Sequence, residues 1–157
     1  LRSLREATLY PGVALIEGAN VSVGRGTATP FEVVGAPWID GRQLAEYLNG
    51  RAVPGVRFEP AAFTPTDAAY RAQHCGGVRI MLADRAQLDA PALGIELASA
   101  LHHLYPDRFD LEVTVGMVGA RWVVRAIAEG EDPRAIAAGW QPALTEFAKV
   151  RQRYLLY

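Results

Sequence analysis

The two halves of this chain carry different hydrophobic patterns, and that division constrains the fold more than any other feature. Short apolar or alternating runs predict strands at residues 13–16, 31–34, 56–59 and 77–83. The second half instead repeats large apolar residues at helical spacing, most clearly in Leu93, Leu97, Leu101 and Leu104. Because strands and helices that segregate along a chain are typical of α+β domains, we expect a short-stranded mixed sheet packed by helices mainly from the second half.

Caps and breakers mark the ends of the expected helices. Asp40 is a plausible N-cap for a helix to about residue 49, and Asp132 with Pro133 opens another to about residue 139. Further helices are predicted at residues 91–104, at 121–129 and from residue 141 onward. The last of these carries an apolar stripe made by Leu144, Phe147, Val150 and Tyr154. Residues 1–8 are compatible with a helix, whereas residues 109–115 fit a strand or a helix equally well.

Composition limits the class of protein. A chain of 157 residues that is 50% hydrophobic is long enough for one domain with a real core, so residues 1–157 are expected to form a single domain. The net charge of -1, without long charge runs, argues against nucleic acid as a partner, and no apolar run is long enough to span a membrane. The single cysteine, Cys75, excludes an intramolecular disulfide. Because the first residue is Leu1 and no signal segment follows, we interpret the chain as a piece of a longer precursor whose compartment is undetermined.

Residues 10–27 concentrate polar side chains on a stretch that must bend sharply, and we interpret them as the functional centre. Glu17, Asn20, Ser22 and Arg25 follow the expected strand at residues 13–16 and are interleaved with glycines. Glycine allows a positive φ and a close approach of the backbone to a ligand. A carboxylate, an amide and a guanidinium on such a loop suit one polar ligand, although the same pattern also fits a loop whose glycines only make turns.

Known nucleotide loops do not match this stretch. The dinucleotide fingerprint needs a helix after its glycines, whereas Gly24-Arg25-Gly26 is followed by Thr29, Pro30 and a strand-like run. The chain also lacks the Gly-Lys-Ser or Gly-Lys-Thr of a Walker loop. The adjacent His102 and His103 diverge by about 100° on a helix and cannot readily share one metal ion. We therefore expect neither a cofactor nor a metal.

A second irregular stretch, residues 61–76, is long for a connection inside a compact domain. Segments of this length are often functional loops. Its polar and aromatic residues are second-tier candidates for the site, with packing the more ordinary role for the first of them: Phe63, Thr64, Thr66, Asp67, Tyr70 and His74.

Several ordered motifs together resemble a known family. They are Tyr-Pro-Gly at 10–12, Glu-Gly-Ala-Asn-Val-Ser at 17–22, Gly-Arg-Gly-Thr at 24–27 and Phe-Glu-Val-Val-Gly-Ala-Pro-Trp at 31–38. The match continues through Phe-Thr-Pro-Thr at 63–66, Cys-Gly-Gly-Val at 75–78, Asp-Arg at 84–85, Leu-Tyr-Pro at 104–106 and Arg-Tyr-Leu-Leu-Tyr at 153–157. In this order they resemble the C-terminal domain of the bacterial exo-β-N-acetylmuramidases, long described as a domain of unknown function.

The resemblance implies a two-domain enzyme of peptidoglycan recycling. Its N-terminal, Rossmann-like domain is absent from this chain and is expected to hold the principal catalytic carboxylate, so no catalytic residue is assigned here. The implied activity is release of N-acetylmuramic acid from the non-reducing ends of peptidoglycan fragments. The implied partners are a muramyl sugar and the N-terminal catalytic domain of the same protein. Two departures put substrate contacts in doubt: Ala19 replaces a usual threonine, and the lysine expected near position 69 is missing.

Our leading hypothesis is that this domain supplies one wall of an interdomain glycosidase site. The expected substrate-binding residues are Glu17, Asn20, Ser22, Arg25, Trp38 and Tyr70. Trp38 is either a sugar-stacking face or a packed residue beside Pro37, and Arg25 either binds the lactyl carboxylate or pairs internally with Glu17. We also expect Trp38 and the N-terminal strands to leave an exposed apolar patch for the missing half. The alternative is a non-catalytic carbohydrate-binding or interaction module, because glycosidases normally need two placed carboxyl groups and this chain has no clear pair.

Overall fold

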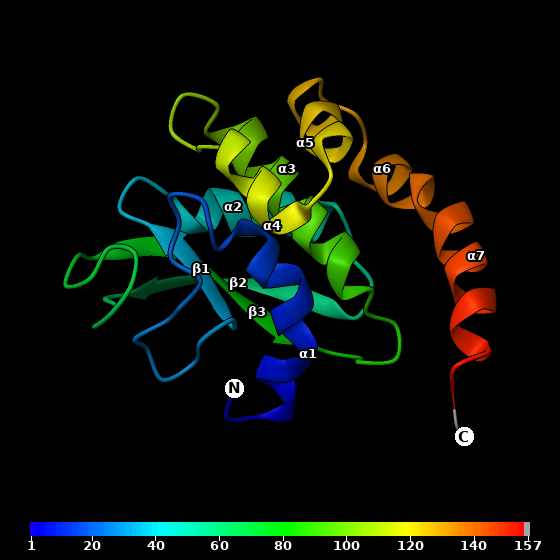
Figure 1. The fold of residues 1–157 in the computed structure, drawn as a ribbon. Coiled ribbons are helices and arrows are strands. Elements are labelled where there is room, and N and C mark those ends of the chain that lie inside the picture. The colour runs from blue at the N-terminus through cyan, green and yellow to red at the C-terminus, as the bar shows by residue number, and fades with distance from the viewer. Residues whose placement is uncertain (156–157) are drawn as a thin grey trace.

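Helix α3 (Ala90–Leu104) lies at the centre of the molecule, which we describe from a computed structural model over residues 1–155 (Figure 1). Asp89 caps the helix by accepting a hydrogen bond from the Ala92 N–H at 3.1 Å. The first three leucines of its repeat, Leu93, Leu97 and Leu101, are fully inaccessible as predicted, and Leu104 is partly buried against the core. Helices from both halves of the chain pack against α3, so the domain has one core.

A three-stranded antiparallel sheet forms the second layer. Strands β1 (Val33–Ala36), β2 (Val56–Phe63) and β3 (Cys75–Leu82) have the order β1-β3-β2, with Val34 opposite Val78 and Phe58 opposite Ile80. Helix α2 (Gly41–Gly50) packs against β2 and β3, and Asp40 caps it through the Arg42 and Gln43 N–H groups. The predicted α+β class and the Asp40 helix are therefore confirmed.

The central strand β3 approaches its neighbours so closely that only glycine fits. A Cβ added to Gly77 would overlap the Val34 carbonyl oxygen of β1, and one added to Gly41 would overlap the Gly77 carbonyl oxygen. The Cys-Gly-Gly-Val motif therefore keeps the sheet and the start of α2 in contact.

The predicted strand at residues 13–16 is wrong. Helix α1 (Leu4–Val13) runs through Pro11 and continues directly into the 3₁₀ helix η1 (Ala14–Ile16). Leu9, Val13 and Ile16 are fully buried, and their spacing is that of a helix. An apolar run of four residues fits a strand or a buried helix, and here packing of α1 and η1 on α3 decides between them.

The strand boundaries also differ from the prediction. Strand β2 continues past Pro60 to Phe63, because β2 is an edge strand and a proline there need not break the central pairing. Strand β1 begins at Val33 rather than at Phe31, which has a φ of 64°. The expected irregular stretch thus shrinks to residues 64–74.

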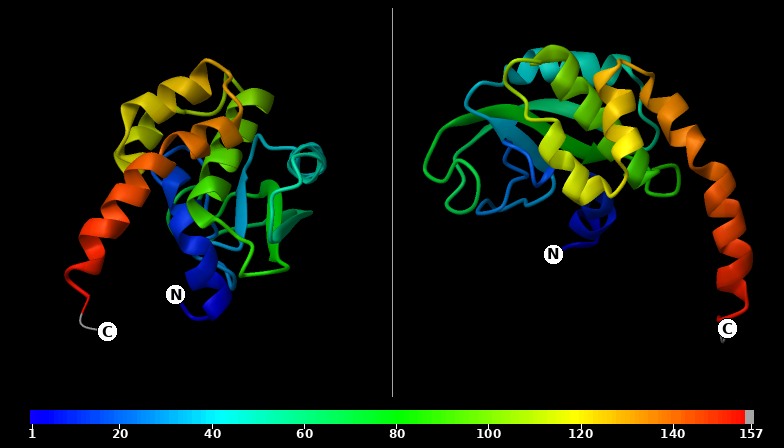
Figure 2. Two further views of the ribbon diagram at one scale, coloured as in Figure 1. Left: turned by 90° about the vertical axis from the view of Figure 1, so that its right-hand side faces the viewer. Right: turned by 45° about the horizontal axis from the view of Figure 1, so that its top comes forward.

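The rest of the domain is helical. It comprises the 3₁₀ helix η2 (Glu112–Thr114) and helices α4 (Val115–Val118), α5 (Arg121–Ala128), α6 (Pro133–Gly139) and α7 (Gln141–Gln152). Asp132 caps α6 as predicted. Residues 109–115, for which strand and helix were left open, contain a turn, η2 and the first residue of α4. Helix α7 projects from the body toward the end of the molecule where the N-terminus also lies (Figure 2). Within residues 1–155 no helix combines the length and apolar character needed to cross a bilayer.

The exposed apolar surface is not where we expected it. Val33, Val34 and Ala36 are buried and Trp38 is partly buried, so they leave no apolar patch. Large apolar side chains are exposed at the N-terminus and on α1, namely Leu1, Leu4 and Tyr10. Others are exposed on η2, α4, α5, α7 and the residues after α7: Val113, Met117, Trp122, Leu144, Phe147, Val150, Tyr154 and Leu155. Helix α2 covers strands β2 and β3 of the sheet.

Candidate functional site

The loop that follows η1 is pinned to the sheet near its middle. Ser22 pairs with Gly35 through two backbone hydrogen bonds of 2.8 and 2.9 Å, which extends the ladder at β1 by one bridge. Ser22 is buried, and its Oγ accepts a hydrogen bond from the Gly24 N–H at 3.3 Å. Ser22 therefore shapes the turn that presents Arg25 rather than facing a ligand itself.

Residues 64–74 form a second loop that packs on the first. The Thr66 N–H and Oγ1 both donate to the Gly26 carbonyl oxygen, at 3.0 and 2.8 Å. Gly26 has a φ of 75°, and a Cβ there would overlap the Asp67 backbone nitrogen. Contact between the two loops therefore requires glycine at position 26. The two stretches that were predicted separately as parts of the site thus lie against each other.

The second loop is strained. Ala68, Tyr70 and Ala72 have φ values of 61°, 60° and 60°, a region that non-glycine residues rarely occupy. Each such residue costs on the order of 1 kcal/mol or more and persists only where its surroundings hold it. Clusters of strained residues are found at binding and catalytic sites, which supports residues 64–74 as part of the site.

Tyr70 is held by a hydrogen-bonded chain across three segments. The Trp38 Nε1–H donates to the Tyr70 hydroxyl at 3.0 Å, and that hydroxyl donates to the Asn20 carbonyl oxygen at 2.9 Å. These three predicted site residues therefore do converge. Since Trp38 and Tyr70 satisfy each other's polar atoms, both are held in one orientation at a partly buried position.

The Asn20 side chain is already satisfied by the protein. Its Nδ2 donates to the Arg108 carbonyl oxygen at 2.7 Å, and its Oδ1 accepts from the Asp110 N–H at 2.9 Å. Both contacts reach nearly ninety residues along the chain. Asn20 thus ties the loop to the segment after α3, and its role in this structure is positioning.

Trp38 contacts a second aromatic residue that our sequence analysis did not assign to the site. Its ring lies edge-on to Tyr105, with centroids 5.4 Å apart and an interplanar angle of 65°. The Tyr105 hydroxyl accepts from the Asp40 N–H at 3.1 Å, and burial raises the pKa of Tyr105. Tyr105 belongs to the Leu-Tyr-Pro motif, so the sequence did mark this residue. Its contact with Trp38 was not evident from the sequence.

Arg25 and Glu17 form an ion pair at the surface. The Arg25 Nε–H donates to Glu17, and the hydrogen bond raises the pKa of Arg25. The side chains are 46% and 21% exposed, so the arginine reaches solvent. Within residues 1–155, the two terminal nitrogens of Arg25 make no hydrogen bond. Internal pairing, which the sequence left open, is therefore present, but it occupies only the Nε side of the guanidinium.

Aromatic rings pack beside the guanidinium group of Arg25. The guanidinium carbon lies 5.0 Å from the centre of the Phe31 ring, and Tyr10 meets the same ring edge-on at 4.8 Å. A cation over an aromatic face is stabilised and restricted in direction. Tyr10 begins the stretch interpreted as the functional centre but was not named as a binding residue, and Phe31 lies outside that stretch. Neither the left-handed backbone of Phe31 nor the helical position of Tyr10 is evident from the sequence.

The other candidates of the second loop lie nearby but differ in environment. Asp67 is exposed and close enough to raise the pKa of Arg25 through its charge. Thr64 and His74 are exposed at the two ends of the loop. The partly buried Phe63 ring packs against Gly35, which agrees with the packing role considered for it.

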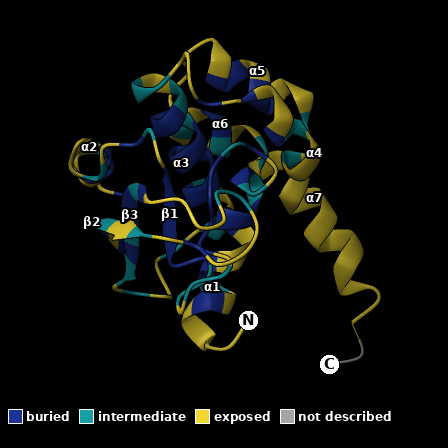
Figure 3. Ribbon diagram, turned by 90° about the vertical axis from the view of Figure 1, so that its left-hand side faces the viewer, coloured by how far each residue is buried: buried dark blue, intermediate teal, exposed yellow. Residues whose placement is uncertain are grey.

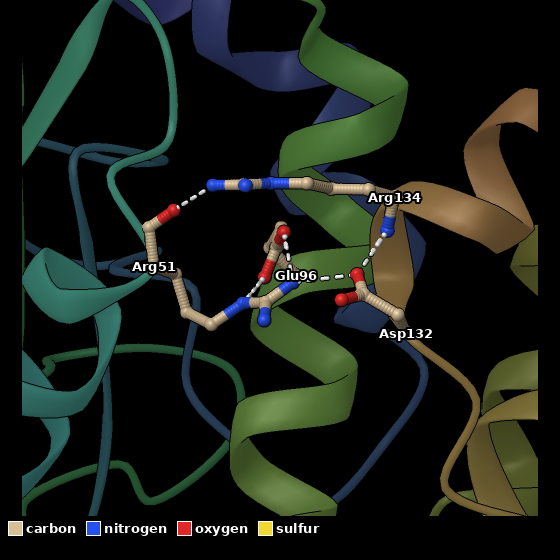
Figure 4. Close-up of polar contacts among 4 residues, drawn as sticks. All are labelled: Arg51, Glu96, Asp132 and Arg134. Carbon is tan, nitrogen blue, oxygen red and sulfur yellow. Dashed lines mark hydrogen bonds and ion pairs between the residues drawn. The ribbon is translucent and has the colours of Figure 1, made fainter.

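A charge network around the buried Glu96, away from these loops, was not predicted from the sequence. Arg51 reaches Glu96 with two hydrogen bonds of 2.9 and 3.1 Å and Asp132 with one of 2.7 Å (Figure 4). Arg134 donates to the Arg51 carbonyl oxygen. Since the four residues come from α2, α3 and α6 or their caps, the network joins three helices and is structural.

Within residues 1–155, no group of three or more His, Cys, Asp and Glu side chains could hold a metal ion. His103 stacks on Tyr47 with ring centroids 5.2 Å apart, whereas the His102 Nδ1 atom is buried. The two histidines therefore face different surroundings, as their adjacent helical positions predict.

Three comparisons with known proteins agree with this architecture. The family described as "Exo-beta-N-acetylmuramidase NamZ, C-terminal" matches residues 8–157. Peptidoglycan beta-N-acetylmuramidase NamZ of Bacillus subtilis is 38% identical over 152 residues, which are 95% of this chain and 37% of that protein. This chain therefore spans little more than a third of its relative.

Two solved structures of DUF1343 family proteins from Bacteroides fragilis share the fold. One is 22% identical with a TM-score of 0.82, covering 96% of this chain and 42% of that one. The other is 28% identical with a TM-score of 0.72, covering 99% of this chain and 41% of that one. Because the family match extends over almost the whole sequence, this chain belongs to the family of NamZ C-terminal domains.

Proposed function

We propose that this chain is the C-terminal domain of an exo-acting β-N-acetylmuramidase that releases N-acetylmuramic acid from the non-reducing ends of peptidoglycan fragments. The observation that carries the proposal is the family match together with the 38% identity to a Bacillus protein named for this activity. The preceding part of the enzyme, which is Rossmann-like by family resemblance, holds the principal catalytic carboxylate. This domain supplies one wall of the substrate site.

The contact between the two loops supports this location for the wall. It gathers the charged pair Arg25 and Glu17, the strained loop at residues 64–74 and the partly buried Trp38–Tyr70 pair. Polar groups on loops that a rigid scaffold holds in place are the usual composition of a binding surface. Sites between two parts of a protein are also a common location for small ligands.

Arg25 recognises the lactyl carboxylate of the muramyl sugar in this proposal. Its Nε is held by Glu17 and its face by Phe31, so the terminal nitrogens are oriented toward solvent before a ligand arrives. A guanidinium can meet a carboxylate with two parallel hydrogen bonds. Glu17 orients Arg25 and does not itself meet the lactyl group, because two carboxylates would repel each other.

The test replaces Arg25 in the full-length enzyme. Arg25→Gln keeps a polar side chain but removes the charge, and loss of a charge-assisted contact at this half-exposed position costs about 1.5 kcal/mol, roughly tenfold in kcat/KM. We expect that loss on a chromogenic N-acetylmuramide and no loss on residual action against an N-acetylglucosaminide. Arg57→Gln is the matched control, because Arg57 is an exposed arginine on β2.

Equal losses of kcat/KM on both sugars would show that Arg25 has a structural role and does not recognise the lactyl carboxylate. A full-length protein that binds muramyl fragments but never hydrolyses them would favour the alternative, a carbohydrate-binding module without catalysis. A stability measurement without ligand accompanies each assay, since a destabilised Arg25→Gln variant would mimic weak binding.

A further inference from the structure

Helix α7 presents an apolar face that nothing within residues 1–155 covers. Leu144, Phe147, Val150 and Tyr154, here called the α7 face, are 50%, 62%, 47% and 79% exposed. They recur at intervals of three or four residues and so share one side of the helix and its C-terminal turn. In Figure 3 the helix is drawn in the colour of exposed residues along its length, and it has no buried residue.

A helix in this position is not stable on its own. Isolated helices shorter than about 12–15 residues are marginal in water, and α7 has 12 residues. Most helical stability in proteins comes from packing an apolar face, yet the face of α7 lies open. The helix therefore requires a partner surface.

The α7 face continues into an apolar groove at the base of the helix. A cavity of about 340 Å³ opens there between α7 and the body, lined mainly by Leu15, Ile95, Val118, Trp122, Trp140 and Leu144. Met117, on α4, and Val113, on η2, add exposed apolar surface on the same chain segment as Val118. An apolar surface of this kind on a small domain marks an interaction site.

We propose that the α7 face and this groove dock the part of the enzyme that precedes this domain, an inference that rests on the proposed function. More than half of each solved relative lies outside the region matched here, since this chain covers 42% and 41% of them. The match of 99% of this chain to one of them includes α7, so the helix belongs to the shared fold. The N-terminus lies at the end of the molecule toward which α7 projects, so a preceding segment joins the domain at that end (Figures 1 and 2).

Charge favours this occupant over a second copy of the chain. Arg151 lies on the same side of the helix as the α7 face, and Arg153 follows at the end of the helix. Lys149 lies toward the other side and pairs with Glu146, the single acidic residue of the helix, at 2.7 Å. Two copies that paired symmetrically through this face would bring the same basic residues together, which costs free energy. The surface that fits is therefore apolar at its centre and acidic at its edge.

Hydrogen exchange on the full-length protein tests the proposal. We expect amides of residues 143–152 to exchange on the order of 100-fold more slowly than in an unstructured chain, as docked helices do. Phe147→Asp places a charge in the α7 face and should reduce that protection roughly tenfold or more. Thr145→Asp is the control, because Thr145 lies on the opposite side of the helix and should leave the protection unchanged.

Unprotected α7 amides in the wild-type full-length protein would overturn the proposal whatever the variants do. Protection that appears only in a dimer, as judged by sedimentation, would overturn it in favour of a second copy. Muramidase activity is measured on the same samples. An active enzyme with an unprotected α7 refutes the docking alone, and a protected α7 in a protein without activity supports docking while refuting the proposed function.

Discussion

Replacing Arg51 by methionine should be among the most damaging changes that spare the apolar core. Arg51 holds Glu96, whose side chain is only 6% exposed, through two hydrogen bonds of 2.9 and 3.1 Å. Methionine fills similar space without a charge. Arg51→Met therefore leaves a carboxylate inside the protein with no cation to balance it.

The loss of stability expected for Arg51→Met follows from how deeply the ion pair is buried. Removing one partner of a fully buried ion pair costs about 3–5 kcal/mol. The Arg51 side chain retains 23% exposure, so water can partly reach the carboxylate and we take the lower end, about 3 kcal/mol. The contact to Asp132, whose side chain is 53% exposed, adds about 0.5 kcal/mol or less.

Urea unfolding measures this directly. A loss of about 3 kcal/mol corresponds to roughly 1–2 M in the urea midpoint and about 6–12 °C in Tm for a chain of this size. Arg125→Met is the matched control, because the Arg125–Glu129 pair is 3.6 Å long with side chains 75% and 60% exposed, and should cost about 0.5 kcal/mol or less. The double variant Arg51→Met with Glu96→Met should recover much of the loss. A loss equal to that of Arg125→Met, or additive losses in the double variant, would refute the reasoning.

Two further perturbations concern the sheet and acid stability. Gly77→Ala should destabilise the domain by about 3 kcal/mol in thermal unfolding, because its Cβ would overlap the Val34 carbonyl oxygen, whereas Gly116→Ala, with no atom within 4 Å of its Cβ, should be neutral or stabilising. The hydrogen bond from Arg51 lowers the pKa of Asp132 below its usual 3.8. The contribution of this contact to the free energy of unfolding is therefore complete above about pH 4, and it is lost as the pH falls through the lowered pKa of Asp132 in the folded protein. Asp132→Asn, which still caps α6, should therefore lose less stability than the wild type between pH 4 and pH 2; an unchanged slope would contradict this.

Local chemistry explains which elements could be predicted from the sequence. Asp40 and Asp132 accept hydrogen bonds from the first turns of α2 and α6, and those contacts involve only the next few residues. The leucine repeat of α3 likewise predicts its buried face. These elements depend on neighbours within one turn, so the sequence pattern is sufficient.

The failures depend on contacts between distant segments. The apolar run at residues 13–16 is helical because Gly12 and Gly94 let α1 approach α3 closely, and neither glycine marks such a contact in the sequence. Pro60 does not end β2, because strand order places β2 at the edge of the sheet. An exposed apolar stripe on α7 was expected as an ordinary amphipathic face, but its partner lies outside this chain in our proposal.

In the candidate site, too, local features could be predicted from the sequence, whereas contacts between distant segments could not. The polar, glycine-rich stretch and the long irregular stretch were each recognisable as loops, and the structure brings them together through Thr66 and Gly26. The support of Arg25 by Phe31 could not be anticipated, since it depends on a left-handed residue in the turn. Backbone groups of Arg108 and Asp110 already bind the Asn20 amide, and the Ser22 Oγ accepts from the Gly24 N–H, so contact of either side chain with a ligand stays a prediction.

Turnover of a chromogenic N-acetylmuramide, measured side by side for the 157-residue chain and for the full-length protein that contains it, tests the central claim most directly. We expect the isolated chain to fold and to show little or no turnover, because in our proposal the principal catalytic carboxylate lies in the preceding part. We expect the full-length protein to hydrolyse the substrate. Robust turnover by the isolated chain that Glu17→Gln abolishes would contradict the division of labour between the two parts.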